Sequence, residues 1–374
     1  MKILLTGGGS GGHFYPLIAV AEEINELVKE KNLLEAEIFF MSDSPYDGEA
    51  LAQNNITFIK SPAGKLRRYF SILNFFDFFK TAWGVVSCLV KVFNLYPDVI
   101  FSKGGYASFP VLFAGRLLKI PVVIHESDSV PGKTNLWAGK FAKKIAVSYP
   151  EAVEFFDKKK VAYTGNPIRK SVENLSVSAK EVIGLTENIP TILILGGSLG
   201  AQLINEEIIQ ILAKLVEKYY VIHQTGKANI EEAVKMSAVV LYDSKFKERY
   251  RPYDYLNDLN LSVAAGASNL IISRAGSTIF EIANWGIPSI IIPITESNGD
   301  HQRRNAFNYA RSGGAIVIEE ENLEPNILLS EIERLITNPE LLKKMSEGAK
   351  SFAKKDAAKV IAEEIINIGL THEK

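Results

Sequence analysis

The chain has 374 residues, which is long for a single hydrophobic core and predicts two domains. Its 47% hydrophobic content and formal net charge of −1 are typical of a globular protein and argue against a general affinity for nucleic acid. The lone cysteine, Cys88, excludes an internal disulfide and fits a reducing compartment. Met1-Lys2 leads directly into a predicted strand without a signal peptide, so we expect a cytoplasmic protein.

The first half of the chain alternates short apolar runs with helical patterns. The first strand is expected at Ile3–Thr6, a glycine loop follows up to His13, and Pro16 is expected in the first turn of a helix. That helix should bury Leu17, Val20, Ile24, Leu27 and Val28. Further strands are predicted at Glu37–Met41, Thr57–Ile59, Pro97–Ser102, Pro121–His125 and Lys160–Tyr163. The alternation predicts a parallel, doubly wound sheet.

The pattern begins again after a turn-rich segment at Thr164–Arg169. Strands are predicted at Thr191–Leu195, Tyr220–Gln224, Asn269–Ser273 and Ser289–Ile292, and helices at Ala201–Tyr219 and from Ser277/Thr278 to Gly286. The chain therefore predicts an N-terminal domain over 1–165 and a C-terminal domain over 166–374. The mostly helical stretch Leu323–Ile368 could pack back on the N-terminal domain.

The loop after the first strand satisfies G-x-G-x-x-G at Gly7, Gly9 and Gly12, which alone is weak evidence for dinucleotide binding. A nicotinamide site also needs an acidic residue about 20 residues further on, and Asp43 comes too late for that. The loop ends in His13. A histidine at a helix start can serve in packing, or it can act as a general base, because an unperturbed imidazole has a pKa of about 6.5.

Two glycine turns at strand ends in the second half, 196–200 and 274–277, favour a diphosphate ligand, since helix N-termini offer free N–H groups. A polar loop from Thr295 to Gln302 follows the next strand. Glu281 has two interpretations: it completes a capping box with Thr278, or it accepts both hydroxyls of a ribose. No H-x-x-x-H or C-x-x-C spacing occurs, so we expect neither a metal site nor a cofactor.

The segment 65–93 combines apolar and basic residues. A stripe at helical spacing is predicted to be a core face, and it consists of Ile72, Phe76, Phe79, Trp83, Val86, Val90 and Phe93. Leu73, Phe75 and Phe78 fall off or at the edge of this stripe, near Lys65, Arg67 and Arg68. Apolar side chains ringed by basic ones are typical of an interfacial membrane contact, although a solvated helix is the alternative. A second basic cluster surrounds Trp137: Lys133, Lys140, Lys143 and Lys144. The longest apolar candidate, 69–96, is interrupted by charges, so no spanning helix is expected.

Several motifs, taken together and in order, resemble those of the MurG family of bacterial peptidoglycan glycosyltransferases. They are Thr6–His13, Gly104–Tyr106, His125-Glu126, Gly165–Arg169, Gly196–Ala201, Ser273–Gly276, His301-Gln302 and Asn305-Ala306. The resemblance implies the GT-B fold, an α/β architecture in which two Rossmann-like doubly wound parallel-sheet domains face a cleft. The second domain would hold most of UDP-N-acetylglucosamine.

The resemblance also implies roles for single residues. Those implied to bind the donor are Ser10, Gly11, Gly12 and Asp128 at the sugar, Arg169 and Ser198 at the diphosphate and nucleoside, Leu256 at the uracil through its backbone, Gly276, Ser277, Thr278 and Ile279 at the phosphates, Glu281 at the ribose, and His301 and Gln302 at the sugar hydroxyls. Those implied for the acceptor and its diphosphate are Gly104, Gly105, Tyr106 and Asn135. Asp128 stands where the family commonly has asparagine.

The implied reaction is an inverting, metal-independent transfer of N-acetylglucosamine to the C4 hydroxyl of the muramoyl sugar in lipid I, undecaprenyl-pyrophosphoryl-MurNAc-pentapeptide, which gives lipid II at the cytoplasmic face of the cell membrane. His13 is the first candidate for the general base and Glu126 the second. Three alternatives remain open: another UDP-sugar enzyme such as a UDP-N-acetylglucosamine 2-epimerase, a nicotinamide-dependent oxidoreductase, and a non-catalytic, membrane-associated nucleotide-binding module.

Overall fold

The computed structural model describes residues 1–33, 35–64, 72–176, 178–185, 189–197, 200–295 and 297–372, with the backbone alone at 72–80, 82, 298 and 372. The chain divides into two compact units. Unit 1 comprises Met1–Arg169 and Lys354–Lys374, and unit 2 comprises Lys170–Ala353. The chain thus enters unit 2 after Arg169 and returns to unit 1 for its last helix.

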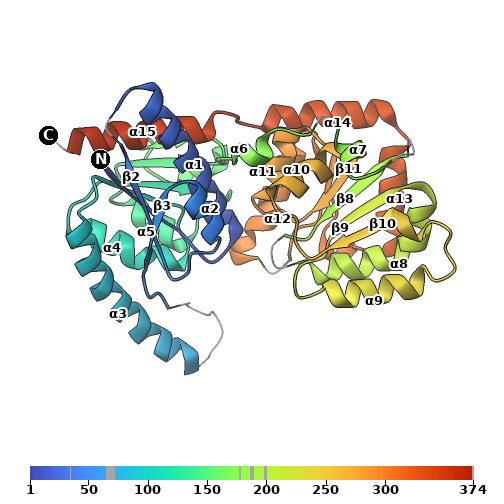
Figure 1. Ribbon diagram of the computed structural model, residues 1–374, viewed down its shortest axis with the longest axis horizontal. Coiled ribbons are helices and arrows are strands. Elements are labelled where there is room, and N and C mark those ends of the chain that lie inside the picture. The colour runs from blue at the N-terminus through green and yellow to red at the C-terminus, as the bar shows by residue number, and fades with distance from the viewer. Residues whose placement is uncertain are drawn as a thin grey trace. The chain divides into compact units, whose positions relative to one another are not determined.

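Unit 1 contains one parallel sheet in the order β3-β2-β1-β4-β5-β6-β7 (Figure 1). Its strands are β1 (Lys2–Thr6), β2 (Glu37–Ser42), β3 (Ile56–Lys60), β4 (Val99–Ser102), β5 (Val122–Glu126), β6 (Lys144–Val147) and β7 (Val161–Tyr163). Its helices are α1 (Gly11–Glu30), α2 (Gly48–Gln53), α3 (Ile72–Leu95), α4 (Phe109–Leu117), α5 (Lys133–Gly139) and α15 (Ala357–His372), with 3-10 turns η1 (Tyr106–Ser108) and η2 (Pro150–Phe155). The central strands are apolar on both faces, as helices on both sides of a parallel sheet require.

Unit 2 repeats this plan with the parallel order β10-β9-β8-β11-β12-β13. Its strands are β8 (Thr191–Leu195), β9 (Tyr220–Gln224), β10 (Tyr250–Tyr253), β11 (Leu270–Ser273), β12 (Ser289–Ile291) and β13 (Ala315–Val317). Its helices are α6 (Lys170–Glu173), α7 (Ala179–Val182), α8 (Gln202–Lys218), α9 (Ile230–Val240), α10 (Asp258–Ala267), α11 (Thr278–Trp285), α12 (His301–Ala310), α13 (Pro325–Ile336) and α14 (Pro339–Phe352), with 3-10 turns η3 (Lys247–Arg249), η4 (Asn298–Asp300) and η5 (Glu320–Asn322).

The strand order reverses direction at one place in each sheet, and these places position the candidate site. In unit 1 the reversal lies between β1 and β4, and in unit 2 between β8 and β11. Loops that leave neighbouring strands at such a point turn to opposite faces, so a crevice opens at the carboxyl ends of the strands, where open α/β sheets bind ligands. The glycine turns predicted from the sequence follow these four strands.

Helix α15 completes the core of unit 1. Ile361, Ile365 and Ile366 are buried in one cluster with Leu17 and Ile24 of α1, and Figure 1 shows α15 crossing α1, against which it packs. The apolar face predicted for α1 is confirmed, because Leu17, Val20, Ile24, Leu27 and Val28 are all buried. Pro16 was expected in the first turn and lies in the second, since α1 already begins at Gly11 with Ser10 as its N-cap.

The core-face prediction for α3 is wrong at the part of the stripe whose side chains the structure describes. Trp83 is 66% exposed, Val86 54%, Val90 55% and Phe93 61%. The buried face carries the small residues Gly84 and Cys88 together with Val92. A Cβ on Gly84 would collide with the carbonyl oxygen of Pro62, so close packing selects the face with small residues and turns the bulky stripe outward.

Candidate active site

In unit 1, the first candidate base lies where β1 passes into α1. Ser10 adopts an extended conformation as N-cap, and its Oγ lies 2.8 Å from Nδ1 of His13. The backbone N–H of His13 also bonds to the Ser10 carbonyl at 3.1 Å. These two contacts orient the half-buried imidazole at the carboxyl end of the sheet, beside the point where the strand order reverses.

Gly104 and Gly105 bring the loop after β4 close to this place. Both have positive φ, 78° and 83°. A Cβ on Gly104 would lie 2.7 Å from Oδ1 of Asn135, and one on Gly105 would lie 2.9 Å from the carbonyl oxygen of Gly8. The two glycines are therefore required for the conformation and for the close approach. Next to them, Tyr106 donates its hydroxyl to Asp43 at 2.7 Å, which engages the acid considered for a nicotinamide site.

A buried lysine, Lys103, lies directly behind these glycines. Its Nζ lies 2.5 Å from Nδ1 of His125, 2.7 Å from Oγ of Ser127 and 3.2 Å from Oδ1 of Asn166. An ammonium has three protons to donate, and these contacts provide three acceptors. Burial lowers the pKa of Lys103, and the carboxylates of Glu126 and Asp128 oppose that shift.

His125 is held as a neutral ring by this lysine. Because the ammonium donates to Nδ1, we assign the ring proton to Nε2, which donates to the Gly165 carbonyl at 2.9 Å. Burial and the neighbouring charge of Lys103 keep the pKa of His125 well below its usual value. His125 therefore ties β5 to the turn at Gly165.

Glu126, the second candidate base, is buried and its carboxylate has three donors. Oε1 accepts from the Asp128 N–H at 3.0 Å, and Oε2 accepts from the Gly132 N–H at 3.0 Å and from Nδ2 of Asn135 at 2.9 Å. Burial and the Asp128 carboxylate raise the pKa of Glu126 to about 7, against these three donors. Through these three hydrogen bonds Glu126 holds the loop 126–132.

Asn135 keeps an acceptor available at the same spot. Its Nδ2 donates to Glu126 and to the carbonyl of His125, while its buried Oδ1 has no hydrogen-bond partner among the residues that the structure describes. A buried acceptor without a donor is where a ligand hydroxyl could bond, which is compatible with the role predicted for Asn135. Arg169, at the end of unit 1, stacks its guanidinium 3.6 Å from the ring centroid of Tyr15.

In unit 2, the predicted phosphate site is the start of α11. The helix begins at Thr278, with Ser277 as N-cap, and ends in a left-handed Gly286. The side chain of Ser277 makes no capping bond, and Thr278 lies one residue inside the helix. The interpretation of Thr278 and Glu281 as a capping box is therefore wrong. The N–H groups of Ile279 and Phe280 donate to the carbonyls of Gly276 and Ser277, so an anion at this end would rely on the N–H groups before them and on the helix dipole.

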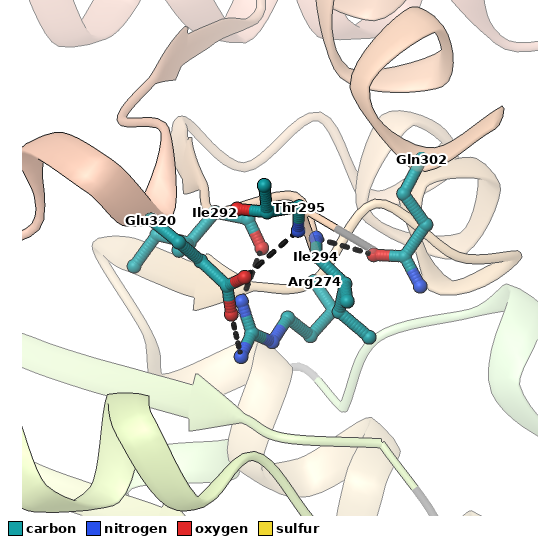
Figure 2. A network of polar contacts seen from close by, with 6 residues as sticks. All are labelled: Arg274, Ile292, Ile294, Thr295, Gln302 and Glu320. Atoms are coloured by element: carbon teal, nitrogen blue, oxygen red, sulfur yellow. Dashed lines mark hydrogen bonds and ion pairs between the residues drawn. The ribbon is translucent and has the colours of Figure 1, made fainter. Parts of the chain in front are cut away.

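The loop after β12 carries the residues predicted to bind the sugar. Gln302, in the first turn of α12, accepts from the Ile294 N–H through Oε1 at 3.1 Å, and its own N–H bonds to Oγ of Ser297 at 3.1 Å. His301 is half-buried at the first position of the same helix. Behind the loop, Arg274 and Glu320 form an ion pair of 2.6 Å (Figure 2).

Leu256 is buried, and its N–H already donates to Oε1 of Gln224 at 3.0 Å. A contact with uracil through this N–H would have to replace that bond. Leu256 also lines a cavity of about 320 Å³ together with Ile222, Tyr253 and Asn260.

Some predicted residues lie outside the part of the chain that the structure describes. They are Ser198 of the donor site and Lys65, Arg67 and Arg68 of the membrane contact. For Leu73, Phe75 and Phe78 the structure describes the backbone of α3 but not the side chains. Among the described residues, no helix is long and apolar enough to cross a membrane, and no group of three or more His, Cys, Asp or Glu side chains could hold a metal.

Sequence reasoning missed two charged residues, Lys103 and Glu320. Lys103 directly follows a buried strand and precedes Gly104-Gly105, so its position at the strand end was a usable signal. Glu320 follows β13, a three-residue strand that was not predicted, as β6 and β10 were not. Shortness alone does not explain this, because β7 and β12 also have three residues and were predicted. In β6 and β10, polar residues or proline interrupt the apolar pattern, namely Lys144 in β6 and Arg251 and Pro252 in β10.

The family comparisons cover both units. The N-terminal domain of glycosyltransferase family 28 matches residues 3–147, and the C-terminal domain of that family matches residues 191–361. A Bacillus cereus protein named UDP-N-acetylglucosamine–N-acetylmuramyl-(pentapeptide) pyrophosphoryl-undecaprenol N-acetylglucosamine transferase 2 is 36% identical over 368 residues, which are 97% of this chain and 99% of that protein. A Treponema denticola protein with the same transferase name, without the number, is 34% identical over 383 residues, with 96% of each chain covered.

Solved structures share the fold. MurG of Acinetobacter baumannii superposes with a TM-score of 0.71 at 24% identity, covering 98% of this chain and 99% of that one. A UDP-GlcNAc 2-epimerase from Neisseria meningitidis bound to UDP-GlcNAc superposes with a TM-score of 0.68 at 15% identity, covering 98% of this chain and 100% of that one. The GT-B fold predicted from the sequence is confirmed. From its family matches and its relatives, the chain belongs to glycosyltransferase family 28 and, within it, to the MurG family of peptidoglycan glycosyltransferases.

Proposed function

We propose that this protein transfers N-acetylglucosamine from UDP-N-acetylglucosamine to the C4 hydroxyl of the muramoyl sugar in undecaprenyl-pyrophosphoryl-MurNAc-pentapeptide, with inversion. The observation that carries the proposal is the identity of 34–36% with transferases of that name over nearly the whole chain. No feature of the described residues favours an epimerase or an oxidoreductase over this reaction, and Asp43 is engaged by Tyr106.

The chemistry assigns different tasks to the two units. A single displacement needs a base that takes the proton of the acceptor hydroxyl, and it needs positive potential at the leaving diphosphate. His13, held by Ser10 at the carboxyl end of the first sheet, is the proposed base. The N-terminus of α11, behind Gly276, is proposed to bind the diphosphate, with Glu281 at the ribose and Gln302 at the sugar.

The test is incubation of the purified protein with UDP-N-acetylglucosamine and a short-chain analogue of the lipid acceptor, followed by mass detection of the disaccharide product. We expect product and free UDP only when both substrates are present. Consumption of UDP-N-acetylglucosamine without acceptor would point to an epimerase. Thermal stabilisation by NADH but not by UDP-N-acetylglucosamine would point to an oxidoreductase, because saturating a site raises stability by about 2.7 kcal/mol at 100 Kd.

We further propose that unit 1 contacts the membrane through the outward stripe of α3, defined as Trp83, Val86, Val90 and Phe93. Four large apolar side chains, each more than half exposed on one helix face, form a surface that soluble monomers seldom leave open. The proposed acceptor is embedded in lipid, so a membrane is the partner that this chemistry requires. The stripe is proposed in addition to Leu73, Phe75 and Phe78, whose side chains lie outside the described part of the chain.

Replacement of Trp83, Val90 and Phe93 together by serine should weaken binding to vesicles that contain anionic lipid by roughly 100-fold or more, since burial of each large apolar side chain is worth about 1.5–3 kcal/mol. Vesicle co-sedimentation measures this. A matched control changes Val239 and Tyr242 of unit 2, which are 73% and 83% exposed, to serine and should bind normally. Undiminished binding by a folded triple variant would remove α3 from the contact.

A further inference from the structure

One ion pair of unit 2 joins two segments that are distant in sequence. Arg274 directly follows β11, and Glu320 opens η5 after β13. Their side chains are only 12% and 18% exposed, and Nη2 of Arg274 lies 2.6 Å from Oε1 of Glu320. Burial raises the pKa of Glu320, but the Thr295 N–H and the Arg274 guanidinium outweigh burial and hold the pKa below its usual value. The carboxylate is therefore ionised near neutral pH.

Both partners also hold the loop between them, as Figure 2 shows. Nη1 of Arg274 donates to the carbonyl of Ile292 at 3.1 Å, at the end of β12. The second carboxylate oxygen of Glu320 accepts from the Thr295 N–H at 2.8 Å. The ion pair thus holds the loop through two backbone groups, the Ile292 carbonyl and the Thr295 N–H, which lie on either side of Ile294.

Ile294, which lies between these two backbone groups, orients Gln302. The Ile294 N–H donates to Oε1 of Gln302, so the carboxamide oxygen faces the loop. The amide nitrogen is left to face away from it, and this group can only donate. A carboxamide without such a bond could flip and present an acceptor instead. The position of Ile294 therefore decides which hydrogen-bonding group Gln302 offers to a ligand.

We infer that Arg274 and Glu320 are positioning residues for the donor sugar, which fix the loop 292–295 so that Gln302 presents N–H donors to a sugar hydroxyl. The inference rests on the proposed function, in which Gln302 binds the sugar. It adds two residues that act through the loop 292–295. Because the diphosphate is proposed to bind at the start of α11 and not at this loop, loss of the ion pair between Arg274 and Glu320 should affect sugar recognition more than UDP binding.

The test compares Glu320→Gln with a neighbouring control, Glu319→Gln. Glu319 pairs with Arg303 at the surface, and among the described residues no hydrogen bond or ion pair joins its side chain to the loop 292–295. For Glu320→Gln we expect the KM for UDP-N-acetylglucosamine to rise about tenfold, as loss of a charged hydrogen-bond partner predicts. We also expect its preference for UDP-N-acetylglucosamine over UDP-N-acetylgalactosamine to fall, with the Kd for UDP within about twofold of wild type. Glu319→Gln should match wild type in its KM for UDP-N-acetylglucosamine, its sugar preference and its Kd for UDP.

A second variant, Arg274→Lys, retains the charge but cannot bridge Glu320 and Ile292 with one planar group. It should likewise raise the KM for UDP-N-acetylglucosamine and weaken the sugar preference while leaving the Kd for UDP nearly unchanged. Equal losses for UDP and UDP-N-acetylglucosamine in both variants would assign the pair to general stability and overturn the inference. Unchanged KM and sugar preference in a folded variant would overturn it as well. Failure of the wild type to bind or use UDP-N-acetylglucosamine would instead defeat the proposed function, so the two failures are distinguishable.

Discussion

Replacement of His13 by alanine should lower kcat by about 10²–10⁴-fold while binding of UDP-N-acetylglucosamine persists. The imidazole lies at the end of the first sheet, and Ser10 fixes its Nδ1 side at 2.8 Å. The variant loses the group proposed to take the acceptor proton, yet the proposed nucleotide site in unit 2 keeps all of its residues. Steady-state turnover with the lipid analogue gives kcat, and titration calorimetry gives the donor affinity.

A graded variant separates positioning from proton transfer. Ser10→Ala keeps the imidazole and removes the hydroxyl that orients it, so we expect kcat to fall by about tenfold or less, while loss of the implied contact of Ser10 with the donor sugar would change the KM for the donor. Near-normal turnover by His13→Ala would exclude His13 as the base. Glu126 would then be the remaining candidate, because its three donors occupy both sites of Oε2 but only one of the two lone pairs of Oε1.

The second large effect concerns stability. Lys103→Met should destabilise unit 1 by roughly 3 kcal/mol, because His125, Ser127 and Asn166 lose their shared donor and the buried Glu126 carboxylate loses a nearby positive charge. For a unit of this size the melting temperature of its transition should fall by roughly 6–12 °C. Differential scanning calorimetry of the full chain, with the transition of each unit resolved, measures this.

Lys143→Met is the matched control. Lys143 precedes β6 in the same unit and is exposed, so the same change of side chain should alter stability by less than about 0.5 kcal/mol. If Lys103→Met had the same melting temperature as Lys143→Met, the buried network around Lys103 would contribute specificity of conformation rather than stability. That outcome is known for some buried ionic groups.

The sequence was sufficient for the fold where an apolar run is followed by a glycine turn. β1, β8 and β11 are mainly apolar, and a glycine turn and then a helix follow each of them, so both sheets and their order of appearance were predictable. The edge strands β10 and β13 were not predicted, and β10 contains Arg251 and Pro252, which are unusual in a strand.

The site was predictable only in its motif residues. The orientation of α3 depends on Gly84 fitting against Pro62, a contact between segments that hydrophobic periodicity does not encode. The burial of Lys103 likewise depends on Asn166, far along the chain, arriving beside β4. A lysine after a strand is usually solvated. Such charges can be identified as buried only once the tertiary contacts are known.

The return of the chain to unit 1 has a consequence for its biosynthesis. Ile361, Ile365 and Ile366 of α15 pack on the apolar surface of α1, and they are synthesised only after the whole of unit 2. Although domains generally fold in the order of their synthesis, unit 1 here remains incomplete until α15 has been made, while the unit encoded between its two parts can already have folded. A nascent chain that stalls before residue 354 would carry a finished second unit and an unsealed first one.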